Sequence, residues 1–208
     1  LLVGGGPGGR VSYMALRRMG VSSVTLVSNE EPTVICSLPY GVGRRLVPGG
    51  PEAVVVDLAK SPRMPSDMLK DILQGTVRSV DAPSRQAVVD TAEGTVTVAF
   101  DTLILAPGAA PWMPALPGIL RESPSSPEGT EVVWGENWID KGELREHVHV
   151  LRGAGDARRL DALASSAKHV VVVGSGAIGL EVAEALVDRG VGVTLAEVLP
   201  HVVSALDE

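Results

Sequence analysis

Two segments of the chain share one pattern of apolar, glycine-rich and amphipathic positions. Residues 1–27 (LLVGGGPGGRVSYMALRRMGVSSVTLV) and 168–197 (KHVVVVGSGAIGLEVAEALVDRGVGVTLAE) each begin with a short apolar run and a glycine-rich turn. Each continues with a helical pattern of about 12 residues, a glycine and a second apolar run. This order predicts a strand, a helix and a parallel strand in both places, and therefore an α/β fold with two βαβ nucleotide-binding units.

The segment between the two units has the period of strands. The runs GTVRSVD, RQAVVDT and GTVTVAF are β-branched and separated by turn residues, so residues 76–100 are predicted to form a small antiparallel β-meander. DTLILAPGAAP (101–111) predicts a buried strand that ends at a Pro-Gly turn. Residues 118–146 are rich in Pro, Ser, Gly and charge, and we expect this surface excursion to be the most mobile segment. Residues 148–167 predict a strand and then a helix.

Charge and composition disfavour several classes of partner, location and ligand. The net charge of −7 and the pI near 5.1 give a field that repels phosphates, so we expect neither nucleic acid nor an anionic membrane surface as a partner. No run of about 18 apolar residues is present, and the chain opens on a strand pattern, so we expect no membrane span and no signal peptide. The single cysteine, Cys36, suits a reducing, cytoplasmic location. The histidines fall in no metal motif, so we expect no metal.

Both glycine-rich turns carry the spacing G-x-G-x-x-G directly after a predicted strand. The glycines are Gly4, Gly6 and Gly9 in the first turn, and Gly174, Gly176 and Gly179 in the second. The first glycine allows the tight turn, the second lets a pyrophosphate approach the backbone, and the third lets helix and strand pack closely. A flexible turn is the alternative for one such pattern, but two copies in the right context predict two dinucleotide sites.

The acidic residue that closes each unit separates the two sites. Glu197 follows Gly174 by 23 residues and ends the run VTLAE, where a carboxylate can accept both ribose hydroxyls of an adenosine. It would repel a 2′-phosphate, so we expect NAD(H) rather than NADP(H); a solvated glutamate at a strand end is the alternative. In the first unit Ser28 stands where an acid is expected, and Glu30 or Glu31 is the candidate ribose partner.

These motifs resemble the flavin-dependent pyridine nucleotide–disulfide oxidoreductases over the whole chain. FDTLILAPGAAP resembles the strand and turn before the crossover between the family's two domains, and GLEVAEAL resembles the helix after the nicotinamide-site glycines. The resemblance implies an FAD/NAD(P)-binding Rossmann-like fold with FAD and NAD(H) as cofactors. It also implies a first segment of the FAD-binding domain at 1–167, which includes the meander, and the start of an NAD-binding domain at 168–208.

The resemblance further implies two sets of cofactor-binding residues. The set expected at FAD is Gly4, Gly6, Pro7, Gly9, Ser28, Glu30, Ala106, Pro107 and Gly108. The set expected at NAD is Gly174, Gly176, Ala177, Ile178, Gly179, Glu181 and Glu197. Glu181 is expected to orient the nicotinamide side.

Cys36 lies in CSLPYG, which resembles the single-cysteine branch of the family. Coenzyme A disulfide reductases and persulfide reductases of that branch carry Cys-x-Leu-Pro-Tyr, whereas members with a redox disulfide carry two cysteines near this place. The resemblance implies that Cys36 is catalytic and pairs with a small thiol, such as a coenzyme A disulfide or a persulfide. A lone thiol does redox work through a mixed disulfide, a persulfide or a sulfenic acid. An inert buried cysteine is the alternative, and Gly41 and Gly43 weaken the case for a helix after it.

The leading hypothesis is therefore an FAD-dependent NAD(P)H oxidoreductase that reduces a disulfide, persulfide or coenzyme A disulfide. Pro7 stands where related NADH oxidases and peroxidases carry a histidine, which disfavours oxygen or peroxide reduction. The alternatives are a ferredoxin-reductase-like electron-transfer flavoprotein, an NADH oxidase, and a nucleotide-binding module without redox activity. The family continues beyond this chain with further FAD and interface segments, through which relatives usually dimerise. We therefore expect an N-terminal fragment that is inactive alone and binds FAD weakly or not at all.

Overall fold

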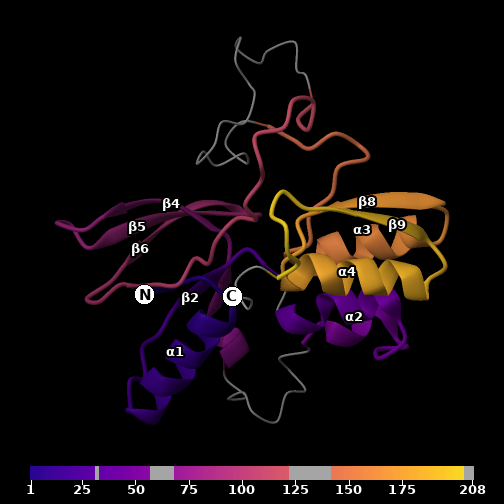
Figure 1. Cartoon of the computed structure of the whole chain (residues 1–208). Helices are drawn as coiled ribbons and strands as arrows, with labels where there is room; N and C mark the ends of the chain where they lie inside the picture. The colour runs from indigo at the N-terminus through magenta and orange to yellow at the C-terminus, as the bar shows by residue number, and fades with distance from the viewer. Residues whose placement is uncertain (31–32, 57–67, 122–141, 204–208) are drawn as a thin grey trace. The chain divides into compact units, whose positions relative to one another are not determined.

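A computed structural model describes residues 1–30, 33–56, 68–121 and 142–203, and they belong to two compact units (Figure 1). The first unit comprises Leu1–Thr33 and Val55–Ala109, and the second comprises Val34–Val54 and Ala110–Glu208. These units do not coincide with the predicted division near Ala167, because Val34–Val54 groups with the second βαβ unit. The predicted division separates an FAD-binding domain from an NAD-binding domain, whereas these units are defined by how compactly the chain packs. The predicted division therefore stays a prediction.

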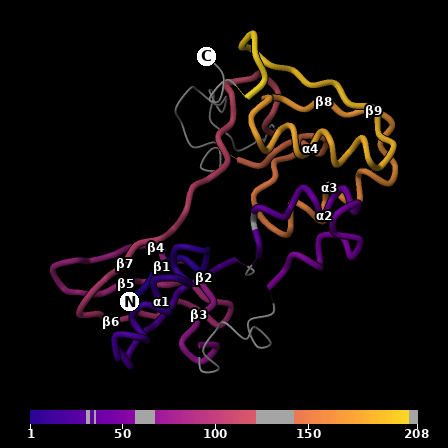
Figure 2. The backbone as a smooth tube through the Cα atoms, turned by 60° about the horizontal axis from the view of Figure 1, so that its bottom comes forward, coloured from indigo at the N-terminus to yellow at the C-terminus, as the bar shows by residue number. Residues whose placement is uncertain are grey.

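A parallel sheet of four strands forms the centre of the first unit (Figure 2). Its order is β3-β2-β1-β7, with β1 at Leu2–Val3, β2 at Leu26–Ser28, β3 at Ile72–Gln74 and β7 at Ile104–Leu105. All three pairings are parallel, as the βαβ pattern requires. The expected buried strand at 101–111 is wrong in part. Only two of its residues form β7, at the sheet edge, and Leu105 is 62% exposed because successive side chains point to opposite faces and Ile104 takes the core face.

Helix α1 (Pro7–Arg18) packs on this sheet through one buried face. Proline suits the first helical turn, where its missing N–H has no intrahelical partner, and Gly20 has a φ of +84° just past the helix end. The fully buried Tyr13 reaches from the middle of α1 to Asp71, and its hydroxyl donates a hydrogen bond of 2.6 Å to the Asp71 carboxylate. The other core residues are Leu2, Val24, Leu26 and Met68.

The meander predicted for residues 76–100 is confirmed. Strands β4 (Thr76–Asp81), β5 (Gln86–Thr91) and β6 (Gly94–Ala99) form an antiparallel sheet in the order β4-β5-β6. The central strand carries the alternation that the sequence shows, since Ala87 and Val89 are fully buried while Gln86 is exposed.

The second unit contains the second βαβ motif, which is also confirmed. Strands β8 (His169–Val173) and β9 (Gly192–Ala196) pair in parallel, and helix α4 (Ala177–Asp188) connects them. Helix α2 (Leu38–Gly43) packs against both α4 and α3 (Ala154–Ala164) (Figure 1). Short 3-10 turns lie at Ile35–Ser37 and Gly50–Val54. The buried core residues that join these elements are Leu38, Val42, Val54, Ala157, Ala164, Ala185, Leu186 and Val191.

Three local predictions for the second unit have different outcomes. Residues 148–152 form no strand, since no strand of the described ranges pairs with them, whereas the helix that follows is present as α3. The excursion at 118–146 is described only at its ends, where Leu120 and Leu144 form an antiparallel bridge; its expected mobility concerns 122–141, outside the described residues. Helix α2 forms despite Gly41 and Gly43, so the argument against a helix there is wrong.

Burial explains why α2 forms. Leu38 and Val42 are buried in the core of the second unit, which outweighs the low helix propensity of glycine. A Cβ atom built on Gly43 would lie only 3.0 Å from the Ala185 Cα, so glycine is what allows α2 to approach α4 closely. No helix within the described ranges is both long and apolar enough to cross a bilayer.

Candidate functional site

Backbone atoms leave no room for a side chain at Gly4, in the turn after β1, or at Gly9, in the first turns of α1. Gly4 has a φ of +107°, and a Cβ built on it would lie 2.0 Å from the Ala106 carbonyl oxygen. A Cβ on Gly9 would lie 1.7 Å from the Gly4 carbonyl oxygen. Around Gly6, by contrast, no atom lies within 4 Å of the Cβ position, so this part of the turn is open. An open backbone at a helix N-terminus fits the pyrophosphate of a dinucleotide.

The predicted FAD residues of the first glycine motif and of the Ala106–Gly108 turn lie together at the carboxyl ends of β1 and β7. The Ala106 N–H donates to the Val3 carbonyl at 2.8 Å, which places the Ala106–Gly108 turn beside Gly4. Gly108 has a φ of +73°, a value that favours glycine in this turn. The structure thus brings the first glycine turn and the Ala-Pro-Gly turn to one edge of the sheet, where a nucleotide binds in folds of this type.

Ser28 is nearly buried and closes a local turn instead of presenting a carboxylate. Its hydroxyl accepts the Glu30 N–H at 3.3 Å and donates to the Glu30 carbonyl at 3.2 Å. A Cβ on Gly5 would lie 2.2 Å from the Ser28 Oγ, so the serine fills the space beside the glycine turn. Glu31, the other candidate ribose partner, lies outside the described residues.

The second glycine turn repeats the construction of the first. Gly174 has a φ of +96°, and a Cβ on Gly179 would lie 2.0 Å from the Gly174 carbonyl oxygen. Gly176 is open within 4 Å of its Cβ position and precedes α4, as Gly6 precedes α1. Ile178 at the start of α4 is 60% exposed, and Glu181 follows on the same helix. These contacts support a second dinucleotide site at this turn.

The Glu197 carboxylate accepts four hydrogen bonds from its own unit. One oxygen accepts the Ser175 N–H at 2.8 Å and the Ser175 hydroxyl at 2.7 Å. The other accepts the N–H groups of Val198 at 2.7 Å and Leu199 at 2.9 Å. The bonds from Leu199 and Ser175 lower the pKa of Glu197 to about 2. Glu197 therefore orders the second glycine turn through Ser175, which is only 1% exposed.

These four hydrogen bonds limit how the Glu197 carboxylate can bind a ribose. A carboxylate offers about four acceptor positions, and four donors already use those of Glu197. A ribose hydroxyl must therefore share or replace one of these donors. The predicted ribose contact stays a prediction, whereas the bond to Ser175 was not anticipated, because a sequence does not show which backbone N–H groups surround a strand end.

Replacing Glu197 with glutamine is expected to loosen the second glycine turn and to weaken NAD(H) binding about tenfold, since an amide cannot accept all four bonds.

Glu197 should also make the stability of the protein depend on pH. Because the folded pKa is lowered from 4.5 to about 2, the carboxylate stabilises the fold above about pH 4.5 and loses this effect as the pH falls towards 2. Unfolding measured from pH 7 to 2 should show this loss in the unsubstituted protein but not in Glu197→Gln. Equal pH profiles would contradict the assignment, with Glu184→Gln as the control.

Cys36 lies exposed in the 3-10 turn Ile35–Ser37, directly before α2. The buried residues Leu38 and Val42 anchor the helix after it, and the Val34 N–H donates to the Val54 carbonyl at 2.9 Å before it. The thiol is therefore presented from a turn that is held on both sides. The alternative of a buried cysteine is therefore wrong, whereas the catalytic role of Cys36 stays a prediction.

Helix α2 is fixed to α4 along its length, although their sequences lie far apart. The Tyr40 hydroxyl donates to the Glu181 carboxylate at 3.1 Å, near the start of α4. Just after α2, Arg45 pairs with Glu184 at 2.6 Å and with Asp188 at 3.2 Å. The helix that follows Cys36 is thus attached to the helix that begins at the second glycine turn. The bond between Tyr40 and Glu181 spans 141 residues of sequence, so no local pattern predicts it.

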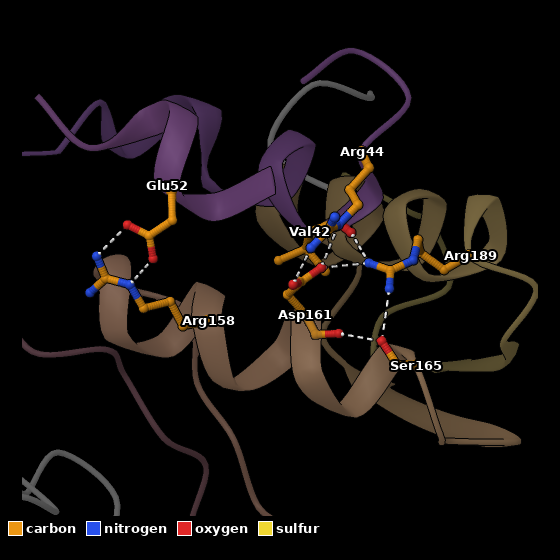
Figure 3. Close-up of polar contacts among 7 residues, drawn as sticks. All are labelled: Val42, Arg44, Glu52, Arg158, Asp161, Ser165 and Arg189. Carbon is orange, nitrogen blue, oxygen red and sulfur yellow. Dashed lines mark hydrogen bonds and ion pairs between the residues drawn. The ribbon is translucent and has the colours of Figure 1, made fainter. Parts of the chain in front are cut away.

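An ionic cluster centred on Asp161 joins α3 to both of these helices (Figure 3). Asp161 accepts two hydrogen bonds from Arg44, at 2.8 and 2.6 Å, and one from Arg189 at 2.6 Å. Arg189 also donates to the Val42 carbonyl, at the end of α2, at 2.8 Å. The bonds from Arg44 are the main cause that lowers the pKa of Asp161. This cluster fixes the far end of the segment that carries Cys36.

No cluster of three metal-ligating side chains occurs among the residues that the structure describes. The chemistry-bearing groups of the second unit are therefore an exposed thiol, the Tyr40–Glu181 pair and a glycine turn ordered by Glu197. In the first unit they are the glycine turn and the Ala-Pro-Gly turn beside it.

Comparison with known proteins assigns these features to a family. The profile of the family described as pyridine nucleotide-disulphide oxidoreductase matches residues 1–208. Two solved structures share the fold at a TM-score of 0.77 and 26% identity: an NAD-dependent persulfide reductase from A. fulgidus, with 100% of this chain covered, and the reduced Bacillus anthracis CoADR-RHD, with 99% covered. Rhodocoxin reductase from Rhodococcus erythropolis is 26% identical over 96% of this chain.

The chain spans only part of each of these relatives. It covers 35% of the persulfide reductase chain, 34% of the CoADR-RHD chain and 40% of rhodocoxin reductase. The family and the fold are therefore shown by the comparison, whereas the substrate and the complete reaction are matters for a proposal.

Proposed function

Because this chain belongs to the pyridine nucleotide-disulphide oxidoreductase family of FAD- and NAD(P)-dependent enzymes, we propose that the full-length protein reduces a small disulfide or persulfide at Cys36. The observation that carries the proposal is the presentation of one exposed thiol, in the order Cys-Ser-Leu-Pro-Tyr, from a turn fixed to the helix of the second glycine turn. The similarity to a persulfide reductase and to CoADR-RHD supports this substrate class.

Different segments of the chain would hold FAD and the pyridine nucleotide. The turn from Gly4 to Gly9 and the neighbouring Ala106–Gly108 turn would hold FAD, and the turn from Gly174 to Gly179 would hold the pyridine nucleotide. Bound FAD would supply the relay of two electrons from the nucleotide to sulfur. Glu181 would orient the nicotinamide side of the nucleotide, and the Glu197 carboxylate would disfavour a 2′-phosphate, so NADH is the proposed reductant.

Cys36 carries the sulfur chemistry. Its thiolate attacks one sulfur of a coenzyme A disulfide, forms a mixed disulfide and releases one coenzyme A thiolate. Two electrons then cleave the mixed disulfide, which restores the Cys36 thiolate and releases the second coenzyme A as a thiol after protonation. With a persulfide substrate, the Cys36 thiolate attacks the outer sulfur, releases the thiolate of the substrate and becomes a persulfide. Two electrons then cleave this persulfide, which releases hydrosulfide and restores the Cys36 thiolate. The single cysteine of this chain also suits the cytoplasmic location that is part of the proposal.

Electron transfer to a protein acceptor is the second candidate, and the similarity to rhodocoxin reductase favours it. In that case Cys36 has no role in turnover, and the protein reduces a ferredoxin or a dye but no disulfide. An NADH oxidase would instead consume oxygen, and a nucleotide-binding module would bind NADH without any turnover. The acceptor that supports NADH consumption therefore distinguishes these candidates.

Replacing Cys36 with serine in the full-length protein tests the proposal. Turnover with coenzyme A disulfide or with a persulfide should fall by at least about 1000-fold, because serine cannot form the sulfur–sulfur bond. Reduction of ferricyanide by NADH should continue, since it needs no thiol. Ser37→Ala is the matched control and should retain disulfide turnover. Retained disulfide turnover in Cys36→Ser would rule out the thiol mechanism and favour the second candidate.

A further inference from the structure

Tyr40 connects the segment that carries Cys36 to α4, the helix that begins at the second glycine turn. It follows Cys36 by four residues, on α2, and its hydroxyl donates to Glu181 on α4 at 3.1 Å. Glu181 raises the pKa of the Tyr40 phenol, first through this hydrogen bond and then through its charge, and the charge of Cys36 contributes in the same direction. The tyrosine hydroxyl is therefore electrostatically sensitive to both groups.

The surrounding contacts leave α2 little freedom to move separately from α4. Gly43 allows close approach to Ala185, and Arg45 is paired with Glu184 and Asp188. The Val42 carbonyl is held by Arg189, in the cluster of Figure 3. A change at Glu181 is thus transmitted to a helix whose other end is fixed, so its effect falls on the first turn of α2, next to Cys36.

Glu181 has acceptor capacity left for a ligand. Within the described ranges Tyr40 is the one hydrogen-bond donor to this carboxylate, and it uses only one of the two oxygens. A carboxylate accepts several hydrogen bonds, so a donor from a bound molecule can add to the Tyr40 bond or weaken it. A nicotinamide carboxamide carries such a donor, and ADP-ribose lacks this carboxamide.

We propose that Tyr40 is a positioning residue that couples occupancy of the nicotinamide position to the reactivity of Cys36, through its hydrogen bond to Glu181. This inference rests on the proposed function, because it places the nicotinamide at Glu181. When the nicotinamide shares the Glu181 carboxylate, the Tyr40 hydroxyl and the turn before it adjust, and the environment of the Cys36 sulfur changes. Linkage adds a reverse effect for equilibria: if NAD⁺ changes the equilibrium for attaching a group to Cys36, that attached group changes the affinity for NAD⁺ by the same factor.

Alkylation of the reduced Cys36 thiol in the full-length protein tests the coupling. The rate is measured by mass spectrometry of the Cys36 peptide without ligand, with saturating NAD⁺, and with saturating ADP-ribose. NAD⁺ should change the rate about fivefold, the factor that one hydrogen bond carries, and ADP-ribose less than about twofold. In Tyr40→Phe, which keeps the ring but removes the hydroxyl, NAD⁺ should change the rate by less than about twofold.

Two further variants keep the test decisive. Arg45→Gln removes a different contact between the same two helices and should retain the response to NAD⁺. Glu181→Ala removes the acceptor from the other side and should lose the response, which covers the case in which Tyr40→Phe does not fold. A full response in Tyr40→Phe, no response in the unsubstituted protein at saturating NAD⁺, or an equal response to ADP-ribose would overturn the coupling. None of these results depends on disulfide turnover, so Cys36→Ser tests the proposed function separately.

Discussion

Replacing Gly9 with alanine is expected to destabilise the first unit by about 3 kcal/mol and to abolish FAD binding. The new methyl group would lie 1.7 Å from the Gly4 carbonyl oxygen and 3.1 Å from a methyl group of Leu2. The first of these atoms belongs to the backbone of the turn, so no side-chain rotation relieves the clash. The helix must move away from β1, which opens the turn and exposes the core around Leu2.

Gly6→Ala is the matched control for this substitution. No atom lies within 4 Å of its Cβ position and its φ is −67°, so alanine fits there without strain. This variant should keep the stability of the first unit but lose affinity for FAD, because the methyl group occupies the place where the pyrophosphate approaches. Amide hydrogen exchange in α1 and β1, with flavin absorbance after dialysis, measures both effects in the full-length protein. Equal loss of stability in the two variants would contradict this account of the turn.

Replacing Asp161 with asparagine is expected to destabilise the second unit by about 2–3 kcal/mol. Its carboxylate, 18% exposed, is the only acid between Arg44 and Arg189 among the described residues, and the variant leaves these two guanidinium groups facing each other. Arg44 also has a φ of +63°, a conformation that the bonds to Asp161 help to hold. Amide hydrogen exchange should show the loss of protection in α2, α3 and α4.

Glu52→Gln is the control, because the pair between Glu52 and Arg158 also links this segment to α3 (Figure 3). That pair is exposed, so its loss should lower the stability much less than the loss of the Asp161 carboxylate does. The pH dependence gives a further check. Since the pKa of Asp161 lies below its ordinary value of 3.8, its contribution is present above pH 3.8 and disappears as the pH falls through the lowered value. The unsubstituted protein and Asp161→Asn should therefore converge in stability in acid. A difference in stability that stays constant with pH would contradict the role given to the Asp161 carboxylate.

The parts of the fold that the sequence predicts well are those determined by local patterns. Both βαβ units follow from an apolar run, a glycine turn and a helical pattern that lie next to one another in the chain. The meander follows from alternation and turn residues in the same way. The predicted strand at 148–152 is wrong because apolar periodicity does not show whether a pairing partner exists. Strand β3 (Ile72–Gln74) is not predicted, because three residues are too short to show a period.

The candidate site is harder to predict, because its important contacts join distant segments. Gly41 and Gly43 read as helix breakers in isolation, yet Gly43 is the residue that lets α2 approach Ala185. Glu197 was expected to face a ribose, and the structure shows it accepting bonds from Ser175 and the backbone that follows it. The spacing of motifs therefore identifies the kind of site, whereas long-range packing determines how the residues within it interact.

The mass of the Cys36 peptide, measured after the full-length protein reacts with coenzyme A disulfide, shows whether this thiol carries the reaction. One coenzyme A should be attached to Cys36 through a disulfide, formed without NADH and removed when NADH is added. Free coenzyme A should appear in two equal portions, one before and one after the addition of NADH. A Cys36 peptide that stays unmodified while NADH is consumed with the disulfide would contradict the claim that this thiol carries the reaction.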